Sequence, residues 1–190
     1  MTSSGWLHLK MGGRIFIVRM TLGFRSPSKK YSFALIQPAE VDQLVEAIVK
    51  SESGGILRNK DFLKRAMINQ DSTITIAAKK KGDLMGVVNG LAIRNQPVSP
   101  QITFIWVKDR TLSLEGVPQM LIETFEKEAR KRNPKASSLD VNLPTFDFNS
   151  IALYSVSGFL IEGFIKGLRG GPDVVIMRRG FQKPSKTPVA

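Results

Sequence analysis

The chain has 190 residues, of which 42% are hydrophobic and 23% are charged, proportions typical of a globular protein that forms one full-sized domain. It contains no cysteine and one histidine, His8, which lies in an N-terminal stretch without a regular pattern. These counts exclude disulfides, cysteine zinc sites, iron–sulfur clusters and a thiol nucleophile. A Ser-His-Asp triad or a multi-histidine metal cage would need residues that the chain lacks, so we predict no metal site.

The net charge of +12 is concentrated at the two ends of the chain. Residues 1–30 carry six basic residues and no acid, and residues 178–190 carry four basic residues and no acid. The segment between them has 18 basic against 16 acidic residues, a net charge of only +2. Basic arms commonly contact phosphate or anionic surfaces, so contact with a polyanion is a hypothesis for the tails rather than for the body.

The two ends are interpreted as extensions of a single domain at residues 31–181. No segment approaches the roughly 20 apolar residues that span a membrane, and the apolar run at 15–18 is too short for a secretory signal. The acid-free stretch 1–30 loosely fits an organellar transit peptide, but we favour a ragged basic extension or an early start codon, and therefore a cytoplasmic protein. Residues 182–190 are predicted to be a basic disordered tail.

The first half of the body alternates between strand-like and helix-like segments. Residues 31–37 form a predicted strand, and Pro38 begins a helix whose apolar residues recur at helical spacing. Gly86 and Gly90, in a later strand, allow a bulge or the close approach of another group. The elements that follow the first helix are a helix at 61–69, a strand at 72–78, a Lys-Lys-Lys-Gly-Asp turn and a returning strand at 84–93.

The second half begins with a strand at 102–107 that is apolar on both faces, which suits a central position. A polar loop at 108–115 leads into a helix at 116–132, which Asn133 and Pro134 end. The remaining predicted elements are a strand at 139–143, a helix at 147–156 that Gly158 ends, and two strands at 159–166 and 173–178.

The resulting order, β-α-α-β-β-β-α-β-α-β-β, combines hairpins with a βαβ crossover. It predicts an α+β fold with a mixed, mostly antiparallel central sheet and helices on both faces.

Residues 147–159, DFNSIALYSVSGF, resemble the motif N-x-x-A-I-x-L-Y-x-x-x-G-F of the GNAT superfamily of N-acetyltransferases. Asp147 replaces the Asn and Ser150 replaces the Ala, and the matching positions are Ile151, Leu153, Tyr154, Gly158 and Phe159. The strand, loop and helix just upstream also resemble that family's acetyl-CoA-binding unit, and the order of elements agrees over about four-fifths of the chain. The resemblance implies the acyl-CoA N-acyltransferase fold, acetyl-CoA as co-substrate and acyltransferase activity.

In that family, a loop of the form R/Q-x-x-G-x-G/A before a helix holds the coenzyme pyrophosphate through backbone N–H groups and the helix dipole. Gly116 matches the first glycine, whereas Ser113 replaces the basic or amide residue and Pro118 replaces the second glycine, which removes one N–H. From the loop alone, an ordinary helix N-terminus is an equal interpretation. The residues that the resemblance assigns to the pyrophosphate are Ser113, Leu114, Glu115, Gly116, Val117 and Pro118, although Glu115 adds a negative charge there.

The resemblance makes Tyr154 the general acid that protonates the departing thiolate. A phenol with a pKa of about 10 is protonated at neutral pH and can donate, whereas the alternative is a tyrosine that packs in the core. Trp106 and Val107, at the strand end, are expected to meet the coenzyme arm and thioester carbonyl, or equally to pack the core. Asn149 is expected to contact the coenzyme, or equally to serve as a cap or turn residue.

No general base is assigned. Without a histidine in the body, deprotonation of an incoming ammonium falls to a carboxylate, a water chain or solvent. Glu162 and Asp109 are the candidates by location, and each also fits an ordinary surface charge.

The sequence therefore predicts an acetyl-CoA-dependent N-acetyltransferase in which a primary amine attacks the thioester directly. A small amine, a peptide amino terminus and a lysine all stay open as acceptors, as does the oligomeric state. The alternative is a GNAT-fold binding module with weakened catalysis that contacts RNA, a ribosome or an acidic partner through its basic tails.

Overall fold

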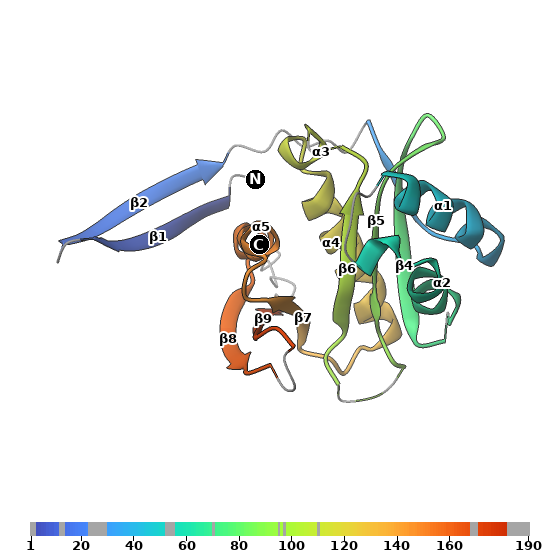
Figure 1. The fold of residues 1–190 in the computed structure, drawn as a ribbon. Helices are drawn as coiled ribbons and strands as arrows, with labels where there is room; N and C mark the ends of the chain where they lie inside the picture. The colour runs from blue at the N-terminus through green and yellow to red at the C-terminus, as the bar shows by residue number, and fades with distance from the viewer. Residues whose placement is uncertain are drawn as a thin grey trace, which may run out of the picture.

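The computed structural model describes residues 3–11, 14–22, 30–51, 56–69, 71–94, 96, 98–109, 111–167 and 171–181, the first two ranges as backbone only. Seven strands form one sheet in the order β3-β4-β5-β6-β7-β9-β8 (Figure 1). Among these neighbours only β6 and β7 run parallel, which confirms the predicted mixed, mostly antiparallel sheet. The strands are β3 (Ser32–Leu35), β4 (Thr73–Lys80), β5 (Asp83–Leu91), β6 (Gln101–Val107), β7 (Ser138–Pro144), β8 (Leu160–Ile165) and β9 (Val174–Gly180).

The predicted hairpin of β4 and β5 is confirmed. Its turn places Lys81 at φ 52° and Gly82 at φ 91°, both in the left-handed region. Two consecutive left-handed residues match the twist of the strands that they join, so the turn sets the register in which Lys80 pairs with Asp83.

Helices cover both faces of the sheet, as predicted (Figure 1). On one face lie α1 (Val41–Ser51), which a short 3₁₀ turn at Pro38–Glu40 begins, and α2 (Lys60–Ile68), which follows a second 3₁₀ turn at Ile56–Arg58. The other face is covered by α4 (Val117–Arg132), and α5 (Phe148–Val156) follows β7. The buried residues of α1 recur at i, i+3, i+4 and i+7, the spacing of one helix face: Val41, Leu44, Val45 and Ile48.

Two glycines of β5 bring α4 close to the sheet. A Cβ at Gly90 would lie 2.4 Å from the Gln101 carbonyl oxygen and 2.6 Å from the Phe125 ring, and β5 shifts register against β6 between Asn89 and Gly90. A Cβ at Gly86 would lie 2.9 Å from the Trp106 carbonyl oxygen. Both predicted uses of these glycines, a bulge and a close approach, are therefore confirmed.

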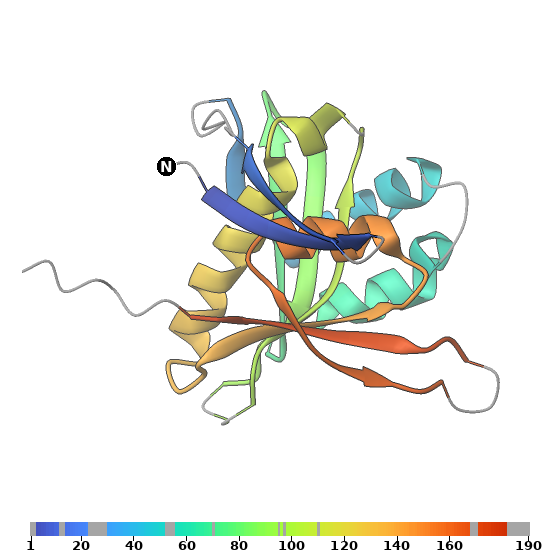
Figure 2. The same cartoon turned by 90° about the vertical axis from the view of Figure 1, so that its left-hand side faces the viewer.

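The strands β7, β9 and β8 form an arm that crosses the direction of β4 and β5 (Figure 2). Gly158 ends α5 in a left-handed conformation, at φ 87°, and sends Phe159 into the core, where it meets the Tyr154 ring edge-on at 5.1 Å. Arg179 of β9 donates to the Ser157 carbonyl at 2.8 Å and forms an ion pair with Glu126 of α4. This ion pair links the arm to the helix that covers the rest of the sheet.

Two predictions need correction. The N-terminal stretch thought to lack a regular pattern contains an antiparallel hairpin, β1 (Ser3–Met11) with β2 (Arg14–Leu22), which includes His8 and lies apart from the main sheet in Figure 1. The sequence does contain a signal for this hairpin. A Gly-Gly pair between two strand-like runs is typical of a hairpin turn. The polar loop at 108–115 contains a short helix, α3 (Thr111–Leu114), too brief to show a helical period in the sequence.

The predicted disordered tail at 182–190 lies outside the described residues. In the part of the chain that the structure describes, no helix has both the length and the apolar character needed to cross a membrane.

Candidate functional site

The sheet opens between its two parallel strands. β6 and β7 pair only at Gln101 with Asp140 and at Ile102 with Val141, although each strand has seven residues. Beyond Ile102 the two strands diverge, while β7 stays paired with β9 along its whole length. The opening therefore lies beside the second half of β6, which leads through α3 into the start of α4.

Backbone groups of β6 face this opening. The Lys108 N–H donates to the Met85 carbonyl of β5 at 2.9 Å. Because successive residues of a strand direct their N–H and C=O groups to opposite edges, the backbone groups of Val107 face away from β5. No described strand pairs with Val107 on that side, so its N–H and C=O are available to a ligand in the opening.

The start of α4 presents backbone donors. Gly116 is the N-cap residue with φ 77°, a left-handed conformation that favours glycine. The first backbone bond of the helix runs from the Met120 N–H to the Gly116 carbonyl at 3.1 Å, so the N–H groups of Val117 and Gln119 precede the helical ladder. Pro118 removes only one of the first-turn donors, and the positive end of the helix dipole lies here.

The negative charge of Glu115 is neutralised locally. Its carboxylate accepts hydrogen bonds from Lys30, at 2.9 Å, and from the Tyr31 hydroxyl. These two donors hold the pKa of Glu115 below its ordinary value. From its charge alone, this carboxylate is expected to oppose a bound phosphate, and its two partners reduce that repulsion.

Tyr154 and Val117 belong to the same buried core cluster, and Val107 packs against that cluster. Its side chain is 1% exposed, and burial, reinforced by the charge of Asp147, raises the pKa of the Tyr154 phenol. The phenol is therefore protonated throughout the neutral range, as a proton donor must be. Asp147 itself caps α5 by accepting from the Ser150 N–H at 3.1 Å, which explains why an aspartate can stand at this motif position.

Other predicted residues lie at a distance from the opening or at the surface. The Trp106 side chain is buried on the face of α1 and α2, where its indole N–H donates to Ser51 at 3.1 Å. Ser113, Leu114 and Asn149 are exposed, the last on α5. The structure therefore places Val107, Val117 at the start of α4 and Tyr154 in or against one core cluster, and it gives Trp106 a packing contact on the other face.

The two candidate bases are already engaged. Glu162 forms an ion pair with Arg178 at 2.7 Å, and the Asp109 carboxylate accepts from the Thr111 N–H at 2.8 Å. Each carboxylate therefore already has a partner within the described residues. Within the described residues, no group of three or more histidine, aspartate or glutamate side chains could hold a metal ion.

Gln119 is a candidate that sequence reasoning missed. It lies in the first turn of α4, and its side-chain oxygen is buried with no hydrogen-bond partner among the described residues. A buried side-chain oxygen without a hydrogen-bond partner, close to the N–H groups at the start of α4, is better explained by a polar ligand than by packing in the core. Its position, one residue past the loop pattern, gave no signal in the sequence.

The geometry can be compared with known proteins. No protein-family model and no curated protein sequence matches this chain. Among solved structures, an acetyltransferase of the GNAT family from Streptococcus pneumoniae is 20% identical, with a TM-score of 0.58 over 80% of this chain and 100% of that one. The ribosomal-protein-S18-alanine N-acetyltransferase from Escherichia coli is 13% identical, with a TM-score of 0.63 over 83% of this chain and 97% of that one.

An aminoglycoside acetyltransferase in complex with coenzyme A and kanamycin is also 13% identical, with a TM-score of 0.59 over 79% of this chain and 94% of that one. The chain thus has the fold of the GNAT acetyltransferases, and it spans nearly the whole length of these neighbours.

Proposed function

We propose that this protein is an N-acetyltransferase that uses acetyl-CoA to acetylate a primary amine. The observation that carries the proposal is the opening between β6 and β7, two parallel strands that pair at only two positions directly before the start of α4. The GNAT fold supports it, as does the packing of Tyr154 in the same core cluster as Val117 at the start of α4.

Each residue of the site has a distinct task in this proposal. Gly116 and the N–H groups of Val117 and Gln119 hold the pyrophosphate at the positive end of α4. The backbone of Val107 orients the pantetheine arm and the carbonyl. When bound, acetyl-CoA supplies the acetyl group as a thioester.

Tyr154 supplies the proton that the sulfur takes up as the thioester bond breaks. Its raised pKa keeps the phenol protonated at neutral pH, so a proton is available there. The attacking amine loses its proton to solvent or a water chain, because Glu162 and Asp109 are held by Arg178 and by the Thr111 N–H.

The test is an assay of free thiol released from acetyl-CoA in the presence of a panel of primary amines. Tyr154→Phe keeps the ring in the core and removes only the hydroxyl. We expect turnover to fall about 100-fold, the lower end for loss of a general acid, with little change in coenzyme affinity. Equal turnover in the variant would contradict the role of Tyr154, and no thiol release with any amine would contradict the enzyme.

A further inference from the structure

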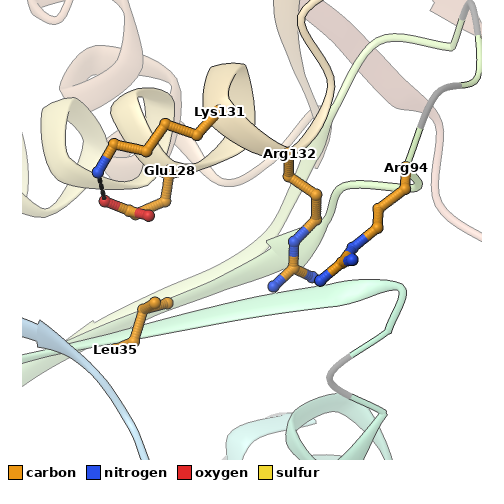
Figure 3. A pocket seen from close by; sticks show the side chains of 5 residues that line it. All are labelled: Leu35, Arg94, Glu128, Lys131 and Arg132. Carbon is orange, nitrogen blue, oxygen red and sulfur yellow. Dashed lines mark hydrogen bonds and ion pairs between the residues drawn. The ribbon is translucent and has the colours of Figure 1, made fainter.

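A second polar site lies at the far end of α4. A cavity of about 400 Å³ is lined by Leu35 of β3, Arg94 after β5, and Glu128, Lys131 and Arg132 of α4 (Figure 3). Gly116 precedes the opposite end of this 16-residue helix, so roughly 24 Å of helix separate the cavity from the proposed coenzyme site.

The guanidinium groups of Arg94 and Arg132 lie next to one another in Figure 3, and the charge of Arg94 acts on Arg132. Arg132 is half-buried, and one of its terminal nitrogens donates to the Thr73 carbonyl at 2.6 Å, which fixes the orientation of the guanidinium. Burial and the charge of Arg94 lower the pKa of Arg132, although Asp71 and Glu128 act in the opposite direction. Two neighbouring guanidinium groups repel one another, and an anion that contacts both of them is attracted by both.

The one acidic side chain that lines the cavity, Glu128, already forms an ion pair. Glu128 accepts from Lys131 at 2.6 Å, so its carboxylate is paired on its own helix (Figure 3). The cavity lining has three cationic side chains against this one carboxylate, which gives it a net positive charge. Guanidinium groups bind phosphate oxygens through paired N–H donors, and two of them match a dianion in charge.

A smaller cavity of about 130 Å³ adjoins the first and shares Leu35 and Arg132 with it. Its lining also includes apolar side chains and hydroxyl groups, from Ile36, Met67, Thr73 and Thr75. A ligand with a charged group on the arginines therefore has an adjoining space for an uncharged part.

We propose that Arg94 and Arg132 bind the phosphoryl group of a small molecule at this end of α4, independently of acetyl-CoA. The site does not depend on the proposed function, since none of its lining residues belongs to the opening between β6 and β7. Free phosphate and a phosphomonoester share the same recognition, and the test includes both.

The test is calorimetric titration of the full chain with inorganic phosphate and with adenosine monophosphate. Arg94→Gln removes one guanidinium at an exposed position, so the variant should fold, and circular dichroism checks this. We expect at least about a tenfold rise in Kd for both probes, the usual cost of losing a hydrogen bond to a charged group. Tighter binding of the nucleotide than of phosphate would show that the smaller cavity contributes.

Lys127→Gln is the matched control, because it removes the same charge from an exposed position of α4 that does not line the cavity. We expect the Kd in this variant to change less than about twofold, because an exposed charge is screened by salt. The proposal is overturned if neither probe binds the wild type at millimolar concentration or if both variants weaken binding equally.

Discussion

At the scale of the residue, burial of Tyr154 determines when the phenol can lose its proton. The unfolded chain releases this proton near the ordinary pKa of 10.0, whereas the folded chain retains it at higher pH. The unfolded state therefore binds fewer protons above that pH, and the free energy of unfolding falls as pH rises further. Below that pH both states hold the proton, and the tyrosine causes no pH dependence.

We expect the wild type to lose stability above about pH 10 more steeply than Tyr154→Phe, by about 1.4 kcal/mol per pH unit. Urea denaturation of both proteins between about pH 9 and pH 11 measures the difference. Tyr31 is present in both proteins and cancels. Parallel stability curves would show that Tyr154 is not buried as described.

The sequence motif around Tyr154 could be interpreted in advance because its residues are mostly structural. Gly158 is needed at φ 87°, and Phe159 packs against the Tyr154 ring. Gln119 could not be identified in this way, because a glutamine in a first helical turn is unremarkable until the unpartnered side-chain oxygen is seen. The hydrogen bond between Trp106 and Ser51 could not be predicted from the sequence either, because the two residues are 55 positions apart in the chain.

At the scale of the element, α4 lies close to β5 because Gly90 has no side chain. We expect Gly90→Ala to destabilise the protein by about 1–3 kcal/mol, because the Cβ would overlap the Phe125 ring and a backbone oxygen. Gly180→Ala is the control, since a Cβ there meets nothing within 4 Å and should change stability by less than about 0.5 kcal/mol. Equal effects in chemical denaturation would contradict the close packing of α4.

The order of the strands and longer helices could be predicted from the sequence. Each of these elements is bounded by turn residues, and its apolar residues recur at a regular spacing. The buried face of α1 shows such a regular spacing, and the Lys81-Gly82 turn of the β4–β5 hairpin is such a boundary. α3 has only four residues, about one turn, so its apolar residues cannot repeat. The divergence of β6 from β7 depends on contacts between distant segments. The opening that positions the site therefore had to come from the structure.

At the scale of the whole molecule, β7 of the arm of β7, β9 and β8 pairs with β6 at two positions among the described residues. The ion pair between Arg179 and Glu126 is a second connection, and both side chains are largely buried, at 16% and 18% exposed. Arg179 also stacks over the Phe159 ring at 5.0 Å. Loss of this arginine should therefore weaken the docking of the arm onto α4.

We expect Arg179→Gln to lower the free energy of unfolding by about 2 kcal/mol, the range for hydrogen bonds to a charged group. Arg130→Gln is the matched control, because Arg130 pairs with the same Glu126 at a longer 3.6 Å and is 40% exposed. It should cost less than about 1 kcal/mol. If denaturation gives the same loss for both variants, the Arg179 contact does not connect the arm to α4 in the way described.

The most direct test of the central claim is calorimetric titration of acetyl-CoA into the wild type and into Gln119→Glu. The new carboxylate would stand beside the pyrophosphate, yet a negative charge at a helix N-terminus does not destabilise the helix. The account predicts that the wild type binds and that Gln119→Glu, shown to be folded by circular dichroism, binds at least about tenfold more weakly. Gln43→Glu makes the same charge change at an exposed position of α1 and should bind like the wild type. Absence of binding to the folded wild type, or equal affinity in all three proteins, would contradict a coenzyme site at the start of α4.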